Sequence, residues 1–145
     1  MLQPMADTER PDTSELTAFI HQQMPLCALL GVEALEMDPA AVRLALPWRA
    51  DLCTAGGRLH GGALIALADS AGAACAFGNL PEGATGTSTI ESKTNFLGGV
   101  RQGRVVATAR PLHVGSTTIV VETEVRDDAD RLVAKVTQTQ VVLRR

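Results

Sequence analysis

The sequence predicts an α+β fold in which one antiparallel β-sheet holds a buried central helix. The segment over residues 59–81 is rich in alanine and glycine, and its only acidic or basic side chain, histidine aside, is Asp69. A helix that is apolar nearly all round is normally buried inside a protein. Everything after this segment consists of β-branched or alternating stretches separated by short turns, which favour antiparallel strands. These two features together define the predicted fold class.

The individual elements follow from local patterns along the 145 residues, a length that favours one domain. Residues 1–13 are expected to form a flexible tail, and residues 14–145 a single domain. A first helix is predicted over 14–23, with Leu16, Phe19 and Ile20 on one face, ending at Pro25. Strands are expected over 31–37, 41–46, 87–97, 103–109, 117–125 and 132–143, the last four in a meander, with loops over 51–58, 98–99, 111–115 and 127–130.

Composition excludes several classes of function. A net charge of −3, with no tyrosine, one tryptophan and three phenylalanines, leaves neither a basic surface nor a stacking platform for nucleic acid. The three cysteines are widely spaced, so no zinc or other metal site is expected, and such cysteines suit a reducing compartment. Neither a signal peptide nor a membrane-spanning segment is visible. We therefore expect a cytoplasmic protein with no membrane partner.

The candidate site centres on Asp69 and on His60-Gly61-Gly62 at the start of the central helix. A carboxylate in apolar surroundings is costly unless it is paired or hydrogen-bonded, so Asp69 either reaches a wet edge, pairs with a cation or serves a function. The first N–H groups of a helix lack internal acceptors and could polarise a carbonyl oxygen, although the glycines could also form an ordinary flexible turn. Eight residues span about 12 Å of helix, so Gly61 and Asp69 could act on one carbon only across two subunits.

The order and spacing of several motifs resemble one known family. Leu59-His60-Gly61-Gly62 followed by Leu67-Ala68-Asp69, the strand over 89–97, Pro111-Leu112-His113-Val114-Gly115 and the strand over 137–143 are similar to hotdog-fold acyl-CoA thioesterases of the phenylacetate-pathway type. The similarity extends from about residue 24 to residue 143. It implies a hotdog fold, a long helix wrapped by a curved antiparallel sheet, in homodimers joined edge to edge and often paired into homotetramers.

The resemblance also implies a reaction and its residues. An acyl-CoA substrate would be hydrolysed to a free acid and coenzyme A at the subunit interface, without a further cofactor. Asp69 matches the catalytic carboxylate, as general base or as nucleophile. Gly61 matches the residue whose N–H polarises the thioester carbonyl. His60 matches the side chain near the leaving group, with helix capping as the alternative. Thr89 matches a hydroxyl that holds the carboxylate, with an ordinary strand residue as the alternative.

The sequence departs from the family pattern at three places. Thr54 stands where members carry asparagine or glutamine, Ala73 replaces a hydroxyl one turn after the carboxylate, and Ser116 replaces a basic residue. We nevertheless expect Thr54 and Ser116 to bind substrate, together with Gly62 and Thr89. The departures leave open a non-catalytic acyl-CoA-binding or regulatory protein. A hotdog hydratase is a third possibility, but its loop motif is absent from this sequence.

The remaining candidates have plainer interpretations. The nucleotide phosphates could meet Arg101, Arg104 or Arg110, although solvated surface charge is the simpler explanation for each. Phe77, Phe96 and Trp48 are the few aromatic side chains that could line an acyl pocket. The cysteines are expected to fill the core. The run over 126–131 is expected to be a solvated turn, and Gln138 and Gln140, which share one strand face, are expected to be exposed or at a subunit contact.

Overall fold

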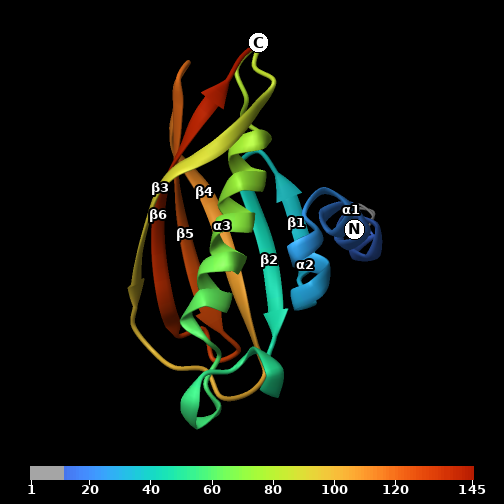
Figure 1. The fold of residues 1–145 in the computed structure, drawn as a ribbon, viewed down its shortest axis with the longest axis vertical. Helices are drawn as coiled ribbons and strands as arrows, with labels where there is room; N and C mark the ends of the chain where they lie inside the picture. Colours follow the sequence, from blue (N-terminus) through green and yellow to red (C-terminus); the bar gives the residue numbers. More distant parts are fainter. Residues whose placement is uncertain (1–11) are drawn as a thin grey trace, which may run out of the picture.

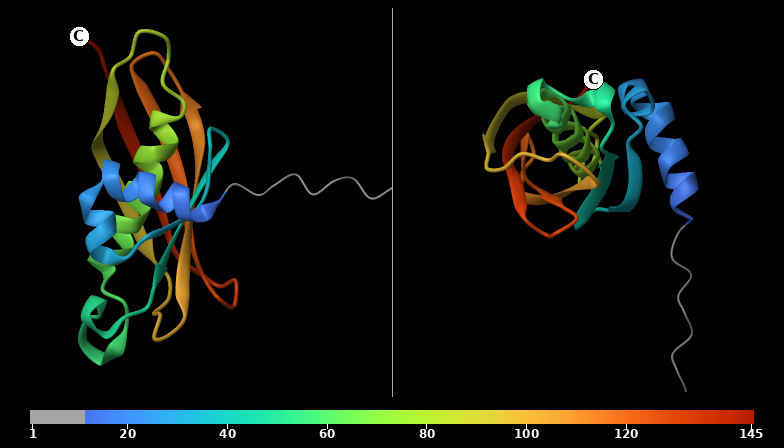
Figure 2. Two further views of the ribbon diagram at one scale, coloured as in Figure 1. Left: turned by 90° about the vertical axis from the view of Figure 1, so that its right-hand side faces the viewer. Right: turned by 90° about the horizontal axis from the view of Figure 1, so that it is seen from below.

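The computed structural model describes residues 12–145 and confirms the predicted α+β architecture. Six antiparallel strands form one curved sheet, and the long helix α3 lies along its concave face (Figure 1). Seen along the helix, the sheet curls around α3 (Figure 2). The helical elements are α1 (Thr13–Gln23), α2 (Pro25–Leu30), the 3-10 turns η1 (Ala50–Leu52) and η2 (Ala55–Gly57), and α3 (Gly61–Phe77). The strands are β1 (Glu33–Asp38), β2 (Ala41–Pro47), β3 (Gly86–Phe96), β4 (Arg104–Val114), β5 (Thr118–Asp127) and β6 (Leu132–Leu143).

The N-terminal region differs from the prediction in two respects. The expected tail lies outside the described residues up to position 11, but Thr13 already begins α1, with the Asp12 carboxylate accepting a hydrogen bond from the Ser14 N–H at 2.9 Å. Pro25 does not end the first helix, which finishes at Gln23. Pro25 is the first residue of α2 instead, because the fixed φ angle and missing N–H of proline suit the first position of a helix.

Helix α3 is buried as its composition predicts. Leu67, Ala68, Ala71 and Cys75 have no exposed surface, and the helix packs against β2, β4 and β5. The small side chains allow the sheet backbone to approach closely, so this helix forms the centre of the hydrophobic core. The helix ends before Gly78 and Asn79, as predicted.

The strand order was only partly predicted. Strands β4, β5 and β6 form the expected meander, but β3 pairs with β6 at one edge of the sheet, and the order is β1-β2-β4-β5-β6-β3. Strand β4 also continues to Val114 through the segment that we expected to be a loop. Its Pro111 is accommodated because the register with β5 shifts between Pro111 and His113, and bulges are among the few places where a sheet tolerates proline.

The two edges of the sheet are covered differently. Helix α1 packs against β1, whereas β3 has no strand beyond its outer edge among residues 12–145. Ile90, Phe96 and Leu97 on and just after β3 are 62%, 51% and 58% exposed. An 11-residue edge strand with exposed apolar side chains presents a row of free backbone groups to a further strand.

Candidate functional site

Asp69 lies half-buried in the middle of α3, on the face turned toward β3. Its Oδ1 accepts two hydrogen bonds, one from the Thr89 hydroxyl at 2.9 Å and one from the Gln138 amide Nε2 at 3.2 Å. The Gln140 amide Nε2 in turn donates to the Thr89 hydroxyl oxygen at 2.6 Å. The carboxylate is therefore held by polar side chains of β3 and β6, without a cationic partner among the described residues.

The prediction that Gln138 and Gln140 are exposed or lie at a subunit contact is wrong, because both are enclosed within the protomer. Their side chains are 1% and 0% exposed, because β6 points alternate residues toward α3. The sequence did contain the signal: Ala134, Val136 and Val142 alternate in phase with the two glutamines and form the buried face of the same strand. Cross-strand pairing places Gln140 directly opposite Thr89, which explains their hydrogen bond.

Gly72 makes room for the amide of Gln138. A β-carbon at position 72 would overlap the carboxamide oxygen of Gln138 and lie 2.8 Å from its nitrogen. Glycine in a helix interior costs about 1 kcal/mol relative to alanine. Its presence three residues after Asp69 therefore has a packing reason, because the amide lies against the helix backbone there.

At the start of α3, His60 adopts the capping role that was the alternative to direct catalysis. Its Nδ1 accepts a hydrogen bond from the Gly62 N–H at 2.8 Å. In the neutral ring the proton then resides on Nε2, and the residue as a whole is exposed. Capping thus fixes the direction of the imidazole and engages the Gly62 N–H, so that Gly62 cannot also serve as an oxyanion donor.

Gly61 keeps its N–H available. As the first residue of α3 it has no acceptor within the helix, and the Phe96 ring of β3 lies beside its Cα. A β-carbon at Gly61 would approach Phe96 Cζ to 3.1 Å, so the ring restricts access to one side of this backbone. Of the three predicted residues in the His60-Gly61-Gly62 motif, Gly61 is the one whose N–H can meet a ligand.

Gly61 and Asp69 are not brought together within one protomer. They lie on the same straight helix, about 12 Å apart at about 1.5 Å per residue. Gly61, Ile65 and Asp69 nevertheless share one stripe of α3, since they are spaced four residues apart. Ile65 between them is 37% exposed, so the stripe opens to the surface.

Thr54 and Ser116 lie at opposite ends of the molecule. Thr54 is exposed in the closed loop before α3, where its N–H donates to the Arg58 carbonyl at 2.8 Å. Ser116 is exposed in the turn between β4 and β5, and its carbonyl accepts from Arg144 at 3.2 Å. Because β4 begins opposite Pro47 near the loop before α3, its far end and Ser116 lie at the C-terminal end of that helix.

The three candidate phosphate-binding arginines lie at different places on the molecule. Arg101 donates to the carbonyl of Gly56 in the loop before α3. Arg104 lies near the carboxylates of Glu33 and Asp128. Arg110 is exposed farther along β4, away from that loop.

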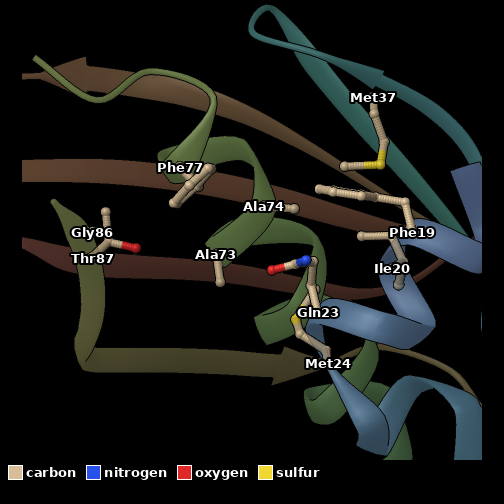
Figure 3. Close-up of a pocket in the computed structure, with 10 residues that line it drawn as sticks. All are labelled: Phe19, Ile20, Gln23, Met24, Met37, Ala73, Ala74, Phe77, Gly86 and Thr87. Carbon is tan, nitrogen blue, oxygen red and sulfur yellow. The ribbon is translucent and has the colours of Figure 1, made fainter.

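An apolar pocket of about 340 Å³ opens between α1, the second half of α3 and the start of β3 (Figure 3). It begins one helical turn from Asp69, at Ala73, and reaches Thr87, two residues before Thr89. Of the aromatic candidates only Phe77 lines it, joined by Phe19, which the sequence did not single out for this role. The full lining comprises Phe19, Ile20, Gln23, Met24, Met37, Ala73, Ala74, Phe77, Gly86 and Thr87.

Trp48 does not line this pocket and instead anchors the end of β2. Its indole Nε1 donates to the Gly57 carbonyl at 3.0 Å and ties the end of β2 to the loop before α3. The run over 126–131 forms the expected hairpin turn, in which Asp127 accepts hydrogen bonds from the backbone and side chain of Arg131.

Two of the three cysteines are buried thiols that resist ionisation. Cys27 and Cys75 are buried in the core as predicted, and Cys53 is half-buried. Burial raises the pKa of the Cys75 thiol to about 11 and also raises the pKa of Cys27. Residues 12–145 bring no three potential metal ligands together, and none of their helices has the length and apolar character needed to cross a bilayer.

Comparison with known proteins shows the family. A sequence profile of the thioesterase superfamily matches residues 56–134. The putative esterase ComA2 of Bacillus subtilis is 33% identical over 74% of this chain and 86% of its own. The 1,4-dihydroxy-2-naphthoyl-CoA hydrolase of Escherichia coli is 34% identical over 60% of this chain and 63% of its own. The crystal structure of a mutant of thioesterase PA1618 from Pseudomonas aeruginosa superposes with a TM-score of 0.82 at 29% identity, covering 94% of this chain and 96% of that one.

The chain belongs to the thioesterase superfamily. The six-stranded curved sheet around a long helix is the hotdog fold, and the chain is a thioester hydrolase. The resemblance that the sequence motifs indicated is thus confirmed at the level of the superfamily.

Proposed function

We propose that the protein hydrolyses acyl-CoA thioesters in a homodimer, with Asp69 of one subunit and Gly61 of the other acting on the same thioester. The observation that carries this proposal is the position of Asp69, a carboxylate fixed through Oδ1 and one helical turn from an apolar pocket of about 340 Å³. An aromatic or medium-length acyl chain suits such a pocket, because its lining is mainly apolar.

The edge strand β3 supports a defined dimer. Pairing of two β3 strands about a two-fold axis would run them antiparallel and continue the sheet across both subunits. The two α3 helices would then also run antiparallel, side by side. With the axis near Ile65, which is midway between Gly61 and Asp69 in the sequence, each Gly61 would face the other subunit's Asp69, and the dimer would contain two equivalent sites.

Each residue then has a chemical role. The Gly61 N–H at the positive end of α3 would donate to the thioester oxygen as negative charge develops on it. Asp69 would activate a water molecule or attack the carbonyl carbon itself. His60, oriented by its cap, would direct its Nε2–H toward the sulfur of the leaving group. Of the candidate arginines, Arg101 would meet the phosphates of coenzyme A in this proposal, because its side chain lies beside the loop before α3 and donates to the Gly56 carbonyl there.

The test is a panel of aromatic and straight-chain acyl-CoA substrates, with release of free thiol as the measurement. Removing a group that acts by acid–base catalysis typically costs about 10²-fold or more in rate, so Asp69→Asn should lower kcat by at least about 10²-fold. Glu82→Gln, a matched loss of one carboxylate at an exposed position on the surface, should leave kcat unchanged.

Two results would overturn the proposal. The assignment of Asp69 fails if Asp69→Asn keeps kcat within a few-fold of the wild type. If the wild-type protein binds acyl-CoA tightly but releases no thiol over the whole panel, the substrate class is bound rather than hydrolysed.

A further inference from the structure

We propose that Gln138 and Gln140 are positioning residues that hold Asp69 by its Oδ1 and so reserve Oδ2 for the reaction. This inference rests on the proposed role of Asp69 and adds two residues of β6 to the catalytic machinery. Both residues lie in the strand over 137–143 that contributed to the family resemblance, but the sequence assigned neither of them a role in the site. Their role follows from the direction of three hydrogen bonds.

All hydrogen-bond donors to Asp69 converge on one carboxylate oxygen. The Thr89 hydroxyl and the Gln138 amide both donate to Asp69 Oδ1. Gln140 occupies the acceptor side of the Thr89 hydroxyl at 2.6 Å, so the hydroxyl proton is directed at the carboxylate. Among residues 12–145 no hydrogen bond reaches Oδ2, which remains the oxygen that can meet water or a thioester carbon.

Keeping these donors in place leaves two buried oxygens without hydrogen bonds, which costs stability. The carboxamide oxygens of Gln138 and Gln140 are buried without a hydrogen-bond partner. A buried unsatisfied acceptor is destabilising. Turning the Gln138 amide over would bring its oxygen against the Asp69 carboxylate, so that two acceptors would face each other. Turning the Gln140 amide over would bring its oxygen against the Thr89 hydroxyl and make it compete with Asp69 for the single hydroxyl proton. The orientation with both nitrogens toward the site is the one that satisfies the carboxylate.

The orientation of the Gln138 amide is restricted by the atoms packed around it. The side chain is fully enclosed, and Gly72 lies against the carboxamide at a distance that excludes any β-carbon. Glycine at this position therefore lets the amide reach Asp69 across the helix backbone. Precise support of this kind limits rotation of the carboxylate, and small misplacements of a reacting group cost rate rather than binding.

The experiment compares thiol release by the wild type with that of three variants. Gln138→Met and Gln140→Met keep an unbranched side chain of similar length but remove the donor. Because hydrogen bonds to charged groups are among the stronger ones, we expect Gln138→Met to lower kcat about 10-fold with KM within about 3-fold. Gln140→Met, one bond farther from the carboxylate, should have a smaller effect in the same direction. Thr123→Val is the matched control, because Thr123 is equally buried on the sheet and its hydroxyl has no partner, and its kcat should equal that of the wild type.

A second readout separates positioning from general disturbance of the core. Gln138→Glu is nearly isosteric, and its carboxyl can donate to Asp69 Oδ1 only when protonated. The ratio of its kcat to that of the wild type should therefore rise as the pH falls from 8 to 6. The same ratio for Gln138→Met should stay flat over that range.

The outcomes distinguish this inference from the proposed function. If wild-type turnover is present and Asp69→Asn abolishes it, but Gln138→Met stays within about 2-fold in kcat, the positioning role is overturned and the proposed function stands. A flat pH ratio for Gln138→Glu also overturns the positioning role. An inactive wild type would overturn the proposed function and this inference with it.

Discussion

Replacing Gly72 with alanine tests the packing beneath Asp69 most directly. At an open position in a helix interior, this change stabilises a protein by about 0.8–1.0 kcal/mol, because alanine has the higher helix propensity. At position 72 the new methyl group would overlap the carboxamide oxygen of Gln138 and lie 2.8 Å from its nitrogen. Both groups are buried, so the amide has nowhere to move without breaking its hydrogen bond to Asp69.

Overpacking of this kind costs about 1–3 kcal/mol. Subtracting the gain in helix propensity leaves a net destabilisation of about 0–2 kcal/mol for Gly72→Ala, with about 1 kcal/mol as the central value. In the background Gln138→Ala the obstructing amide is gone, so the same substitution should be stabilising by up to about 1 kcal/mol. The structure thus predicts that the sign of the effect reverses between the two backgrounds, with a coupling energy of about 1–3 kcal/mol.

The assay is urea unfolding of the four proteins of this cycle, followed by far-ultraviolet circular dichroism at one fixed protein concentration. A free energy of unfolding that rises by the same amount when Gly72→Ala is made in either background would refute the close approach of Gln138 to the helix. Thiol release measured on the same samples should fall for Gly72→Ala, because the displaced amide no longer donates to Asp69.

Four further predictions concern association, the thiols and the core. Ile90→Asp, which places a charge on the exposed edge of β3, should shift the protein toward monomer in analytical ultracentrifugation and lower kcat; an unchanged mass would argue against pairing through this edge. In the native protein a thiol reagent should modify the half-buried Cys53 before the buried Cys27 and Cys75, and equal rates for all three would contradict their burial. Since burial raises the pKa of Cys75 from 9.0 to about 11, the folded state keeps a proton that the unfolded state loses, and stability to urea should fall between pH 9 and pH 11. Leu67→Ala, at a side chain with no exposed surface, should cost about 2–5 kcal/mol in the same unfolding assay.

The Asp69 carboxylate accepts hydrogen bonds through Oδ1, and no described residue donates to its Oδ2. The Thr89 hydroxyl and the Gln138 amide approach Oδ1 from β3 and β6. Asp69 shares its stripe of α3 with Gly61 and the part-exposed Ile65, and the proposed second subunit would approach along that stripe. Such an arrangement separates the residues that fix Asp69 from those that would meet the substrate. In the proposed mechanism, the core strands β3 and β6 therefore contribute to the site together with the motif at the start of α3.

The sequence determined the elements whose causes are local. The apolar, alanine-rich segment around Asp69 predicts a buried helix, and the β-branched or alternating stretches after it predict strands, because periodicity depends on neighbours along the chain. The special backbone at His60-Gly61-Gly62 and the lone carboxylate at Asp69 likewise drew attention to the site, since each is an exception to its own surroundings.

Only the tertiary structure decided the contacts between distant segments. The pairing of β3 with β6 joins residues some fifty positions apart, and nothing in the spacing of the turns distinguishes it from a simple meander. That pairing places Gln140 opposite Thr89. As a result, two polar glutamine side chains are buried and contribute to the hydrogen bonds that hold Asp69. The physical reason is that strand order and burial are properties of the assembled sheet, in which the cost of enclosing a polar amide is offset only by a partner that the folded chain brings to it.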